Sequence, residues 1–339
     1  MKVGLLITGL TAADTVRAAQ AAERHGLNSC WIVEDLWNRG AVPLATACLY
    51  GTERITVGVG VVNPYTRHPT LFAMDYGVLA EMSRGRAILG IGASVEAWID
   101  QMGLEYRLPR TATKEAIEIA RELLAGETCN FRGRAFTVDR VKLSFPVEHR
   151  TPMYMAAMGE QTVRTCGEVA DGWVVSLLEP IGYIREAMGW LRQGAQTAGR
   201  DADAIEVVQY FPLSCNTDSR RAKDAVKPLI ALFLAGEFSL YERQKPVMRS
   251  LRDFIGSLSP DEYMSLLREL ESGADPVTTI PDALVDELSI AGTPEECVLA
   301  LRRYADAGVT EAALLPAGDP EATALILGDR IRPLLNGGK

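Results

Sequence analysis

Short apolar runs alternate with longer amphipathic segments along the whole of the 339-residue chain. Most of these runs lack polar alternation, which is typical of parallel strands buried on both faces. There are eight apolar runs: Lys2–Ile7, Asn28–Val33, Ile55–Val62, Arg86–Ile91, Pro152–Ala157, Gly172–Leu177, Ile205–Cys215 and Thr310–Leu315. The pattern therefore predicts eight buried strands.

The segments between the runs carry helical spacing and helix-boundary signals. One apolar stripe falls at i, i+3, i+4, i+7 and i+8: Ala116, Ile119, Ala120, Leu123 and Leu124. Near the end of the chain, Thr293–Glu296 is a capping box, and its helix stops at Gly308 directly before a strand. Eight strand–helix units predict a (β/α)₈ barrel, an α/β fold; an open doubly wound sheet is the alternative.

Two segments exceed what a minimal barrel needs. Residues 129–145 have the pattern of a small hairpin. Residues 233–289 are a mostly helical insertion before the last predicted helix, and their Pro, Gly and charge content indicates a lid or flap. Because no Gly-, Ser- or Pro-rich linker divides the chain, we expect a single domain over residues 1–335.

Composition narrows the class of protein. The chain has 35 basic and 44 acidic residues, a net charge of −9, which argues against non-specific binding to nucleic acid or anionic membranes. No apolar run reaches the ~18–20 residues of a membrane span, and Met1–Ile7 has the character of a strand rather than of a secretory signal. Six cysteines without a CxxC pair and three separated histidines favour a reduced, cytoplasmic protein without a metal site.

The active site of a (β/α)₈ barrel lies at the carboxyl ends of its strands, so the residues after each run are the candidates. Glu34, Asp35, Asn38 and Arg39 follow the second run and could form a polar pocket wall, or only a solvated loop. Glu34 and Asp35 are the candidate general acid/base groups.

The third run is rich in glycine, which lets a planar ligand or a second backbone approach closely. It is followed by Asn63, Tyr65, Arg67 and His68. Tyr65 and Arg67 are expected to shape or charge the pocket. His68 is a weaker acid/base candidate, since a histidine beside a proline is more often a packing or capping residue.

The fourth and fifth runs also end in candidate ligand-binding turns. Gly92, Ala93 and Ser94 begin like a dinucleotide-binding fingerprint, but Val95 stands where its third glycine would be. Gly159 opens a helix, whose free N–H groups could hold an anion; Glu160 in the first turn would also favour the helix without a ligand.

Taken in order, several stretches resemble the luciferase-like barrel superfamily, and most of all the coenzyme F420-dependent methylenetetrahydromethanopterin reductases of methanogens. The resemblance covers residues 1–330. It is carried by Trp31-Ile32 with Asn38-Arg39, Gly60 to Arg67, Gly85-Arg86-Ala87, Leu89 to Gly92, Tyr154 to Ala157, Ala170-Asp171-Gly172, Gly292 to Glu296 and Ala307-Gly308-Val309.

The resemblance implies a TIM barrel of the bacterial-luciferase type and a non-prolyl cis peptide between Gly60 and Val61, behind the central ring of the deazaflavin. It implies a homodimer or homotetramer built through helices near strands 2 and 3, and a coenzyme phosphate beside Gly159. The residues then expected to bind the cofactor are Asn38, Arg39, Gly60, Val61, Val62, Asn63, Gly92, Ala93, Ser94, Met158, Gly159, Glu160 and Gln161.

The chain also departs from these reductases at positions near the reacting atoms. Leu6 stands where they carry an acid, Glu34-Asp35 where they carry Asp-His, Met158 where they carry Gln, and Ala93-Ser94-Val95 where they carry Pro-Gly-Asp. Loss of polar partners costs selectivity for a polar substrate. We therefore expect a retained scaffold with a substrate other than a methylene-pterin.

Three hypotheses follow. The first is an F420-dependent oxidoreductase that moves a hydride between the deazaflavin and a small organic substrate. The second is an FMN-dependent monooxygenase of the same superfamily, which would use O₂ and often a partner flavin reductase. The third is a barrel that binds flavin or F420 without turnover.

Overall fold

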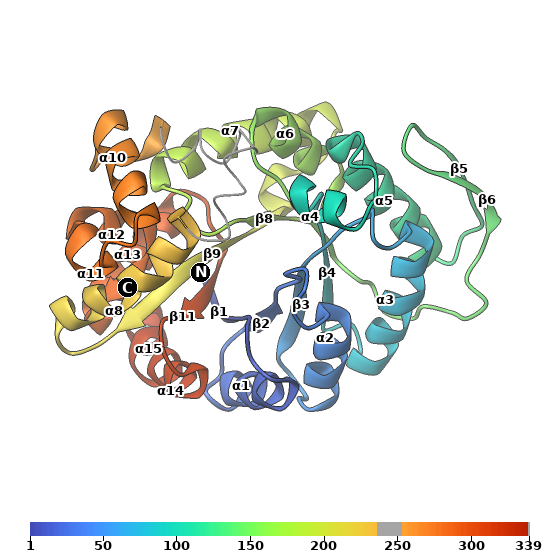
Figure 1. The fold of residues 1–339 in the computed structure, drawn as a ribbon. Helices are drawn as coiled ribbons and strands as arrows, with labels where there is room; N and C mark the ends of the chain where they lie inside the picture. The colour runs from blue at the N-terminus through green and yellow to red at the C-terminus, as the bar shows by residue number, and fades with distance from the viewer. Residues whose placement is uncertain (236–252, 338–339) are drawn as a thin grey trace.

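The computed structural model describes residues 1–235 and 253–337, and its sheet closes into a barrel (Figure 1). The strands are paired in the order β10-β9-β11-β1-β2-β3-β4-β7-β8, and β8 pairs back onto β9. Every pairing within this sheet is parallel. The eight barrel strands are β1 (Lys2–Ile7), β2 (Ser29–Ile32), β3 (Thr56–Val62), β4 (Ala87–Ile91), β7 (Met153–Ala156), β8 (Gly172–Val175), β9 (Glu206–Cys215) and β11 (Glu311–Pro316).

All eight predicted strands are present, with ends that agree to within two residues. The closed barrel confirms the fold predicted from the pattern and rules out the open sheet. One strand, β10 (Ile290–Gly292), has no counterpart among the predictions, because three residues are too few to show a pattern. It extends the sheet beside the far end of β9, where Ile290 lies opposite Leu213.

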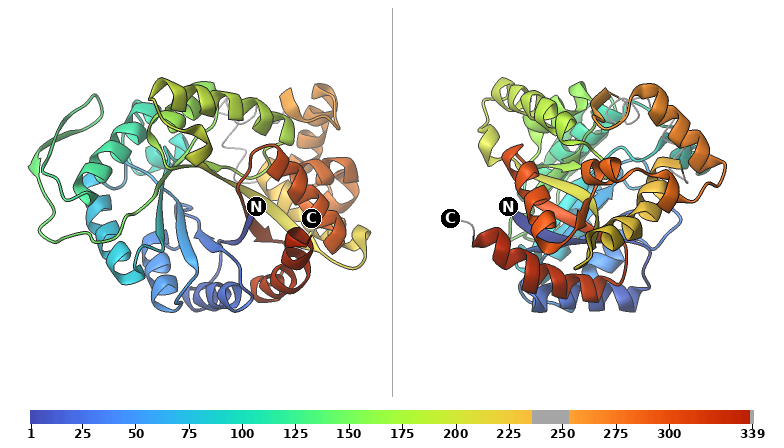
Figure 2. Two further views of the ribbon diagram at one scale, coloured as in Figure 1. Left: turned by 180° about the vertical axis from the view of Figure 1, so that it is seen from behind. Right: turned by 90° about the vertical axis from the view of Figure 1, so that its left-hand side faces the viewer.

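Helices surround the strands, as both faces of the ribbon show (Figures 1 and 2). Apart from those of the later insertion, the described α-helices are α1 (Ala12–Arg24), α2 (Ala41–Tyr50), α3 (Pro69–Ser83), α4 (Glu96–Gln101), α5 (Pro109–Leu124), α6 (Glu160–Val169), α7 (Ile181–Thr197), α8 (Ser219–Ala235), α13 (Pro294–Asp306), α14 (Pro320–Ile326) and α15 (Arg332–Asn336). The stripe on α5 is buried as predicted, and α13 begins with the predicted capping box at Thr293.

Both extra segments have the predicted type of structure where they are described. Residues 129–145 contain the hairpin of β5 (Cys129–Arg132) and β6 (Thr137–Val141), which projects from the side of the barrel beyond α3 and α5 (Figure 1). The later insertion contains α10 (Pro260–Glu271), α11 (Pro276–Thr279) and α12 (Asp282–Leu288). Part of the predicted lid, residues 236–252, lies outside the described residues.

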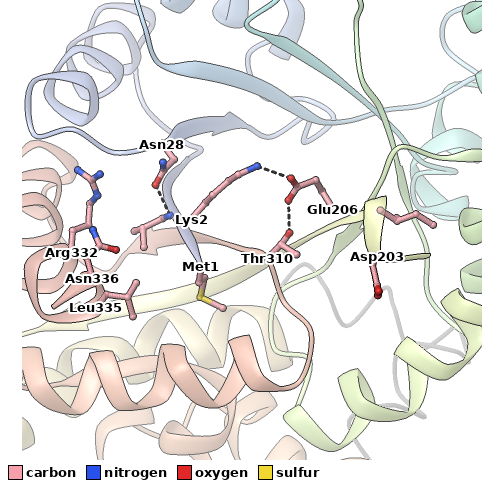
Figure 3. A pocket seen from close by; sticks show the side chains of 11 residues that line it. Met1, Lys2, Asn28, Asp203, Glu206, Thr310, Arg332, Leu335 and Asn336 are labelled. Atoms are coloured by element: carbon pink, nitrogen blue, oxygen red, sulfur yellow. Dashed lines mark hydrogen bonds and ion pairs between the residues drawn. The ribbon is translucent and has the colours of Figure 1, made fainter. Parts of the chain in front are cut away.

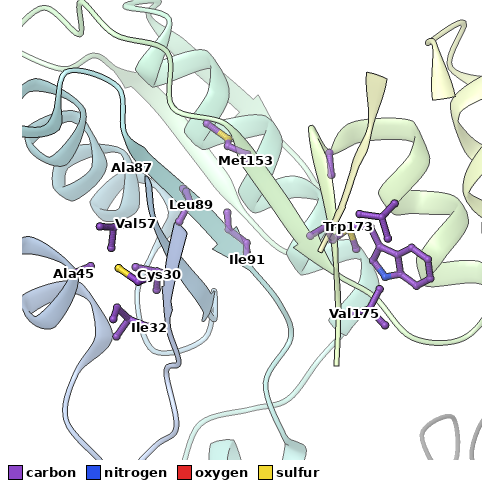
Figure 4. Close-up of a cluster of buried hydrophobic side chains, with 14 of the residues drawn as sticks. Cys30, Ile32, Ala45, Val57, Ala87, Leu89, Ile91, Met153, Trp173 and Val175 are labelled. Carbon is purple, nitrogen blue, oxygen red and sulfur yellow. The ribbon is translucent and has the colours of Figure 1, made fainter. Parts of the chain in front are cut away.

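The main core lies between the strands and the outer helices (Figure 4). Cys30, Val57 and Leu89 point outward from neighbouring strands into this layer, and Ala45 meets them from α2. A second apolar cluster fills the barrel interior and includes Leu6, Trp31, Tyr154 and Tyr210. Since the interior is filled at this level, it does not form a continuous channel, and the active site of such a barrel is expected above it, at the carboxyl ends of the strands. Among the described helices, none is long and apolar enough to cross a membrane.

Candidate active site

A cavity of about 590 Å³ opens at the carboxyl ends of the barrel strands. Strand ends, the start of α5 and side chains from the helical insertion all contribute to its lining. The described lining residues are Leu6, Thr8, Val33, Glu34, Asp35, Gly60, Val61, Gly92, Ala93, Ser94, Val95, Glu96, Trp98, Tyr106, Pro109, Arg110, Thr113, Ala156, Ala157, Met158, Thr162, Val174, Ser176, Leu177, Leu178, Tyr210, Phe233, Leu234, Tyr263 and Leu315.

One wall of the cavity consists of small residues from three neighbouring strand ends. Gly60 and Val61 come from β3, and the peptide bond between them is cis, as the resemblance implied. Gly92 follows β4, and a Cβ atom added to it would lie 2.6 Å from Val61 Cγ2 and 3.0 Å from the Cβ of Ala156. The wall is therefore closely packed and smooth, which suits the face of a planar ring.

Two carboxyl groups lie at the end of β2. The Ala41 N–H at the start of α2 donates a 2.6 Å hydrogen bond to Glu34 Oε2, and no partner is recorded for Oε1 among the described residues. Burial raises the pKa of Glu34, the hydrogen bond from Ala41 opposes the rise, and the charge of Asp35 adds to it. Thr8 Oγ1, just after β1, donates a 2.8 Å hydrogen bond to Asp35 Oδ2. Glu34 is thus a carboxyl group that keeps its proton to higher pH than an ordinary glutamate.

Two cavity residues have a left-handed backbone. Ser94 has φ 64° and Leu178 has φ 63°, a conformation that costs a residue other than glycine about 1 kcal/mol. Such conformations cluster at ligand-binding sites, where the surroundings hold them in place. Both turns directly follow barrel strands, so their shape sets the rim of the cavity.

The predicted residues after β3 are not all brought to the cavity. Tyr65 is not among the described lining residues: its hydroxyl donates to the Arg107 carbonyl at 2.9 Å, and its ring packs 5.0 Å from that of Tyr106, which does line the cavity. Burial, and then the charge of Glu96, raise the pKa of Tyr65 to about 12. Tyr65 therefore packs against a lining residue, Tyr106, without being in the described lining itself.

Arg67 and His68 have structural partners. Arg67 Nε lies 2.6 Å from Asp75 Oδ2 on α3, so its charge is paired away from the cavity lining. His68 is the N-cap of α3, with Nδ1 3.3 Å from the Thr70 N–H, and burial lowers the pKa of its ring. These contacts agree with the interpretation of His68 as a capping residue.

Four residues expected at the cofactor lie beside the cavity rather than in its described lining. Asn38 and Arg39 are exposed beyond the end of β2. Val62 is buried in the main core. Asn63 Oδ1 accepts hydrogen bonds from the N–H groups of residues 65 and 66, at 3.1 and 3.0 Å, and so shapes the turn after β3.

Only part of the expected anion site at the start of α6 belongs to the described lining of the cavity. Met158 and Thr162 line the cavity, but Gly159, Glu160 and Gln161 are not among the described lining residues. Gly159 has φ 75° and is the N-cap of the helix, while Glu160 pairs with Arg164 at 2.6 Å. A role for this helix start in holding phosphate stays a prediction.

Several lining residues were not predicted as site residues. Thr8 directly follows the first predicted run, so reading every strand end in the same way would have found it. Ser176 follows β8, but it lies inside the predicted run Gly172–Leu177, which extends two residues beyond the strand. Arg110, Phe233 and Tyr263 come from helices, where no signal in the sequence marks them as facing a cavity.

A second pocket, of about 450 Å³, lies at the opposite end of the barrel (Figure 3). There Lys2 Nζ lies 2.7 Å from Glu206 Oε1, and Thr310 Oγ1 donates a 2.6 Å hydrogen bond to Glu206 Oε2. Burial tends to raise the pKa of Glu206, but its bonds to Lys2 and Thr310 prevail and lower it. The carboxyl group there is already paired, in contrast to Glu34.

Comparison with known proteins assigns this architecture to a family. Residues 3–311 match the model of the luciferase-like monooxygenases, so the chain belongs to that family and is an oxidoreductase. It is 32% identical over 303 residues to the 5,10-methylenetetrahydromethanopterin reductase of Methanolobus tindarius, with 89% of each chain covered. It is 29% identical to the F420-dependent glucose-6-phosphate dehydrogenase of Nakamurella multipartita, covering 74% of this chain and 80% of that protein.

Among solved structures, the coenzyme F420-dependent tetrahydromethanopterin reductase of Methanopyrus kandleri superposes with a TM-score of 0.84 at 24% identity. The match covers 98% of this chain and 99% of that one, and it shows a common fold. The similarity to F420-dependent proteins confirms the resemblance that the sequence motifs indicated.

Proposed function

We propose that the chain uses coenzyme F420 to transfer a hydride to or from a small organic substrate. The observation that carries the proposal is the combination, in one cavity, of a smooth wall of small residues and a half-buried carboxyl group with a raised pKa. Two relatives are named as F420-dependent, which supports the choice of cofactor. When bound, the reduced coenzyme supplies the hydride from its deazaflavin ring.

The residues present fit such a ring. Val61 and Ala156 offer a flat apolar surface, and the glycines beside them leave no side chain in the way. Leu6 and Leu315 line the cavity from β1 and the end of β11, and Phe233 and Tyr263 from the helical segments. An apolar enclosure of this kind orients the substrate and excludes water, and both effects contribute to hydride transfer.

Glu34 is the group we assign to proton transfer. In the direction of reduction, Glu34 Oε1 holds a proton and delivers it to the oxygen or nitrogen of the substrate as the adjacent carbon accepts the hydride. Asp35 accepts a hydrogen bond from Thr8, and its charge adds to the rise in the pKa of Glu34. The substrate is therefore a molecule with a polarised C=O or C=N bond, or the corresponding alcohol or amine.

The test is oxidation of reduced F420 by a panel of simple ketones, imines and enones. The double variant Glu34→Gln/Asp35→Asn should turn over at least about 100-fold more slowly, because general acid catalysis contributes about 10²–10⁴-fold. Its affinity for F420 should stay nearly unchanged. Full activity of the double variant would contradict the roles assigned to these carboxyl groups.

FMN is the alternative cofactor, because the matched family is one of monooxygenases and a monooxygenase with a similar fold, from Pseudomonas putida, is in complex with FMN. The same smooth wall would accept a flavin ring, and a reductase would then have to supply the reduced flavin. Oxygen uptake with reduced FMN, without oxidation of reduced F420, would favour this second function.

We also infer that the chain forms a homodimer or homotetramer through α2 and α3. Four apolar residues on α3 are each more than a third exposed and share one face: Leu71, Met74, Val78 and Met82. Met74→Glu/Val78→Glu should lower the mass measured by light scattering, and an unchanged mass would contradict this interface.

The six free cysteines support a reducing, cytoplasmic location.

A further inference from the structure

Beneath the cavity, two aromatic side chains form a floor inside the barrel. Trp31 comes from β2 and Tyr210 from β9, and their ring centroids lie 6.1 Å apart at an angle of 58°. Trp31 Nε1 donates a 2.7 Å hydrogen bond to the buried carboxyl group of Glu311, which fixes the indole ring. Tyr210 also lines the cavity, so it is the upper member of this floor.

Tyr210 spans the barrel and contacts the smooth wall from below. In the closed sheet, β9 is separated from β3 by three strands in either direction, so the two strands lie opposite each other. A Cβ atom added to Gly60 would overlap Tyr210 Oη; it would also lie 3.1 Å from Tyr210 Cζ and 3.2 Å from Trp31 Cε3. The hydroxyl oxygen thus fills the space directly under Gly60.

The Tyr210 hydroxyl acts at this place through its volume. It is buried, and no hydrogen-bond partner is recorded for it among the described residues. A buried polar group without a partner costs about 1–3 kcal/mol, so replacing the tyrosine by phenylalanine should not destabilise the protein. Phenylalanine would keep the supporting ring and lose only the oxygen that a Cβ atom at residue 60 would overlap.

We propose that Tyr210 is a positioning residue: its side chain supports Gly60 across the barrel and sets the height of the Gly60–Val61 segment against the bound cofactor ring. The inference rests on the proposed function, because it takes the ring to lie on that segment. Because Tyr210 acts through steric contact with Gly60, the effects of substituting these two residues on the free energy of cofactor binding should not be additive.

The experiment is a double-mutant cycle read out by the dissociation constants of F420 and FMN in fluorescence titrations of the full chain. Gly60→Ala should weaken binding of the preferred cofactor by about tenfold or more, because the added methyl group must displace the wall. Tyr210→Phe alone should change binding by no more than about threefold. The double variant Gly60→Ala/Tyr210→Phe should recover most of the loss, since the overlapping oxygen is gone.

Gly172 provides a matched control for the glycine substitution. A Cβ atom there would lie 2.7 Å from the ring of Tyr154, also inside the barrel, but neither residue lines the cavity. Gly172→Ala should therefore lower the melting temperature without changing the dissociation constant. An equal effect of the Gly60 and Gly172 variants on binding would reduce the role of Gly60 to general stability and overturn the inference.

The remaining outcomes separate the two proposals. If the unmodified protein binds neither F420 nor FMN, the proposed function fails. If it binds one of them, and Tyr210→Phe does not rescue Gly60→Ala, the positioning role of Tyr210 fails alone. Should Gly60→Ala not fold, Tyr210→Leu replaces it: loss of the support should weaken binding by several-fold more than Tyr210→Phe does, and equal affinities of these two variants would overturn the role.

Discussion

Glu34 is half-buried and Glu311 is fully buried, and these two glutamates of one barrel have very different surroundings. Burial raises the pKa of both. Glu311 Oε1 accepts hydrogen bonds from Ser29 Oγ and Trp31 Nε1, in a closed interior. Glu34 accepts one backbone hydrogen bond and faces a cavity. A raised pKa therefore does not by itself mark a catalytic group; access to a substrate does.

The largest expected effect is on stability at Glu311. Glu311→Ala would leave Ser29 and Trp31 as buried donors without an acceptor, at a cost on the order of 3 kcal/mol. Glu34→Ala would free only the Ala41 N–H, at about 0.5–1.5 kcal/mol. Urea denaturation of both variants checks the difference, and equal losses would remove the contrast between the two sites.

For the pH dependence of turnover, the larger effect is expected at Glu34 and not at Glu311. In the direction of reduction, Glu34 must be protonated, so the rate should fall as the pH rises through its raised pKa. Glu34→Gln should lose this limb of the pH–rate profile, whereas Glu311→Gln should keep it. A profile that changes in Glu311→Gln but not in Glu34→Gln would reverse the assignment.

Glu311 should instead affect the pH dependence of folding. Because its folded pKa is raised, the folded state favours the protonated carboxyl group. The stability this contributes is present below the ordinary pKa near 4.5 and is lost as the pH rises through the folded pKa. The stability of Glu311→Gln relative to the unmodified protein should therefore increase with pH across that window. Denaturation curves at several pH values measure it, and a pH-independent difference would exclude this linkage.

The smallest effect is expected at the pocket near the N-terminus. The Lys2–Glu206 ion pair is partly exposed, with 49% and 34% of the two side chains accessible. Such pairs contribute at most about 1 kcal/mol. Lys2→Met should shift the urea midpoint only slightly and leave turnover unchanged. A loss of turnover would give this second pocket a role that the account does not assign.

The barrel itself could be predicted because buried parallel strands leave a direct trace in the sequence. Each apolar run marks one strand, and the residue after it marks the carboxyl end, which is how Glu34, Asp35 and Gly92 were placed at one cavity. The Gly60–Val61 cis peptide came from the family resemblance, since no local pattern specifies it.

The remainder of the site depends on tertiary contacts that the sequence pattern does not encode. Arg67 looks available in the sequence, but Asp75, eight residues later, pairs with it in the fold. Tyr210 lies within a predicted strand, and only closure of the barrel places its hydroxyl under Gly60. Arg110 enters the cavity from a helix, where the position of a side chain depends on how the helix packs.

The central claim is that this cavity holds F420 for hydride transfer, and a side-by-side titration of the unmodified protein with F420 and FMN tests it most directly. At about 100 times its dissociation constant, the preferred cofactor should stabilise the protein by about 2.7 kcal/mol. The account predicts that F420 produces this shift and that FMN does so only at much higher concentration. Preference for FMN, or binding of neither, would contradict it.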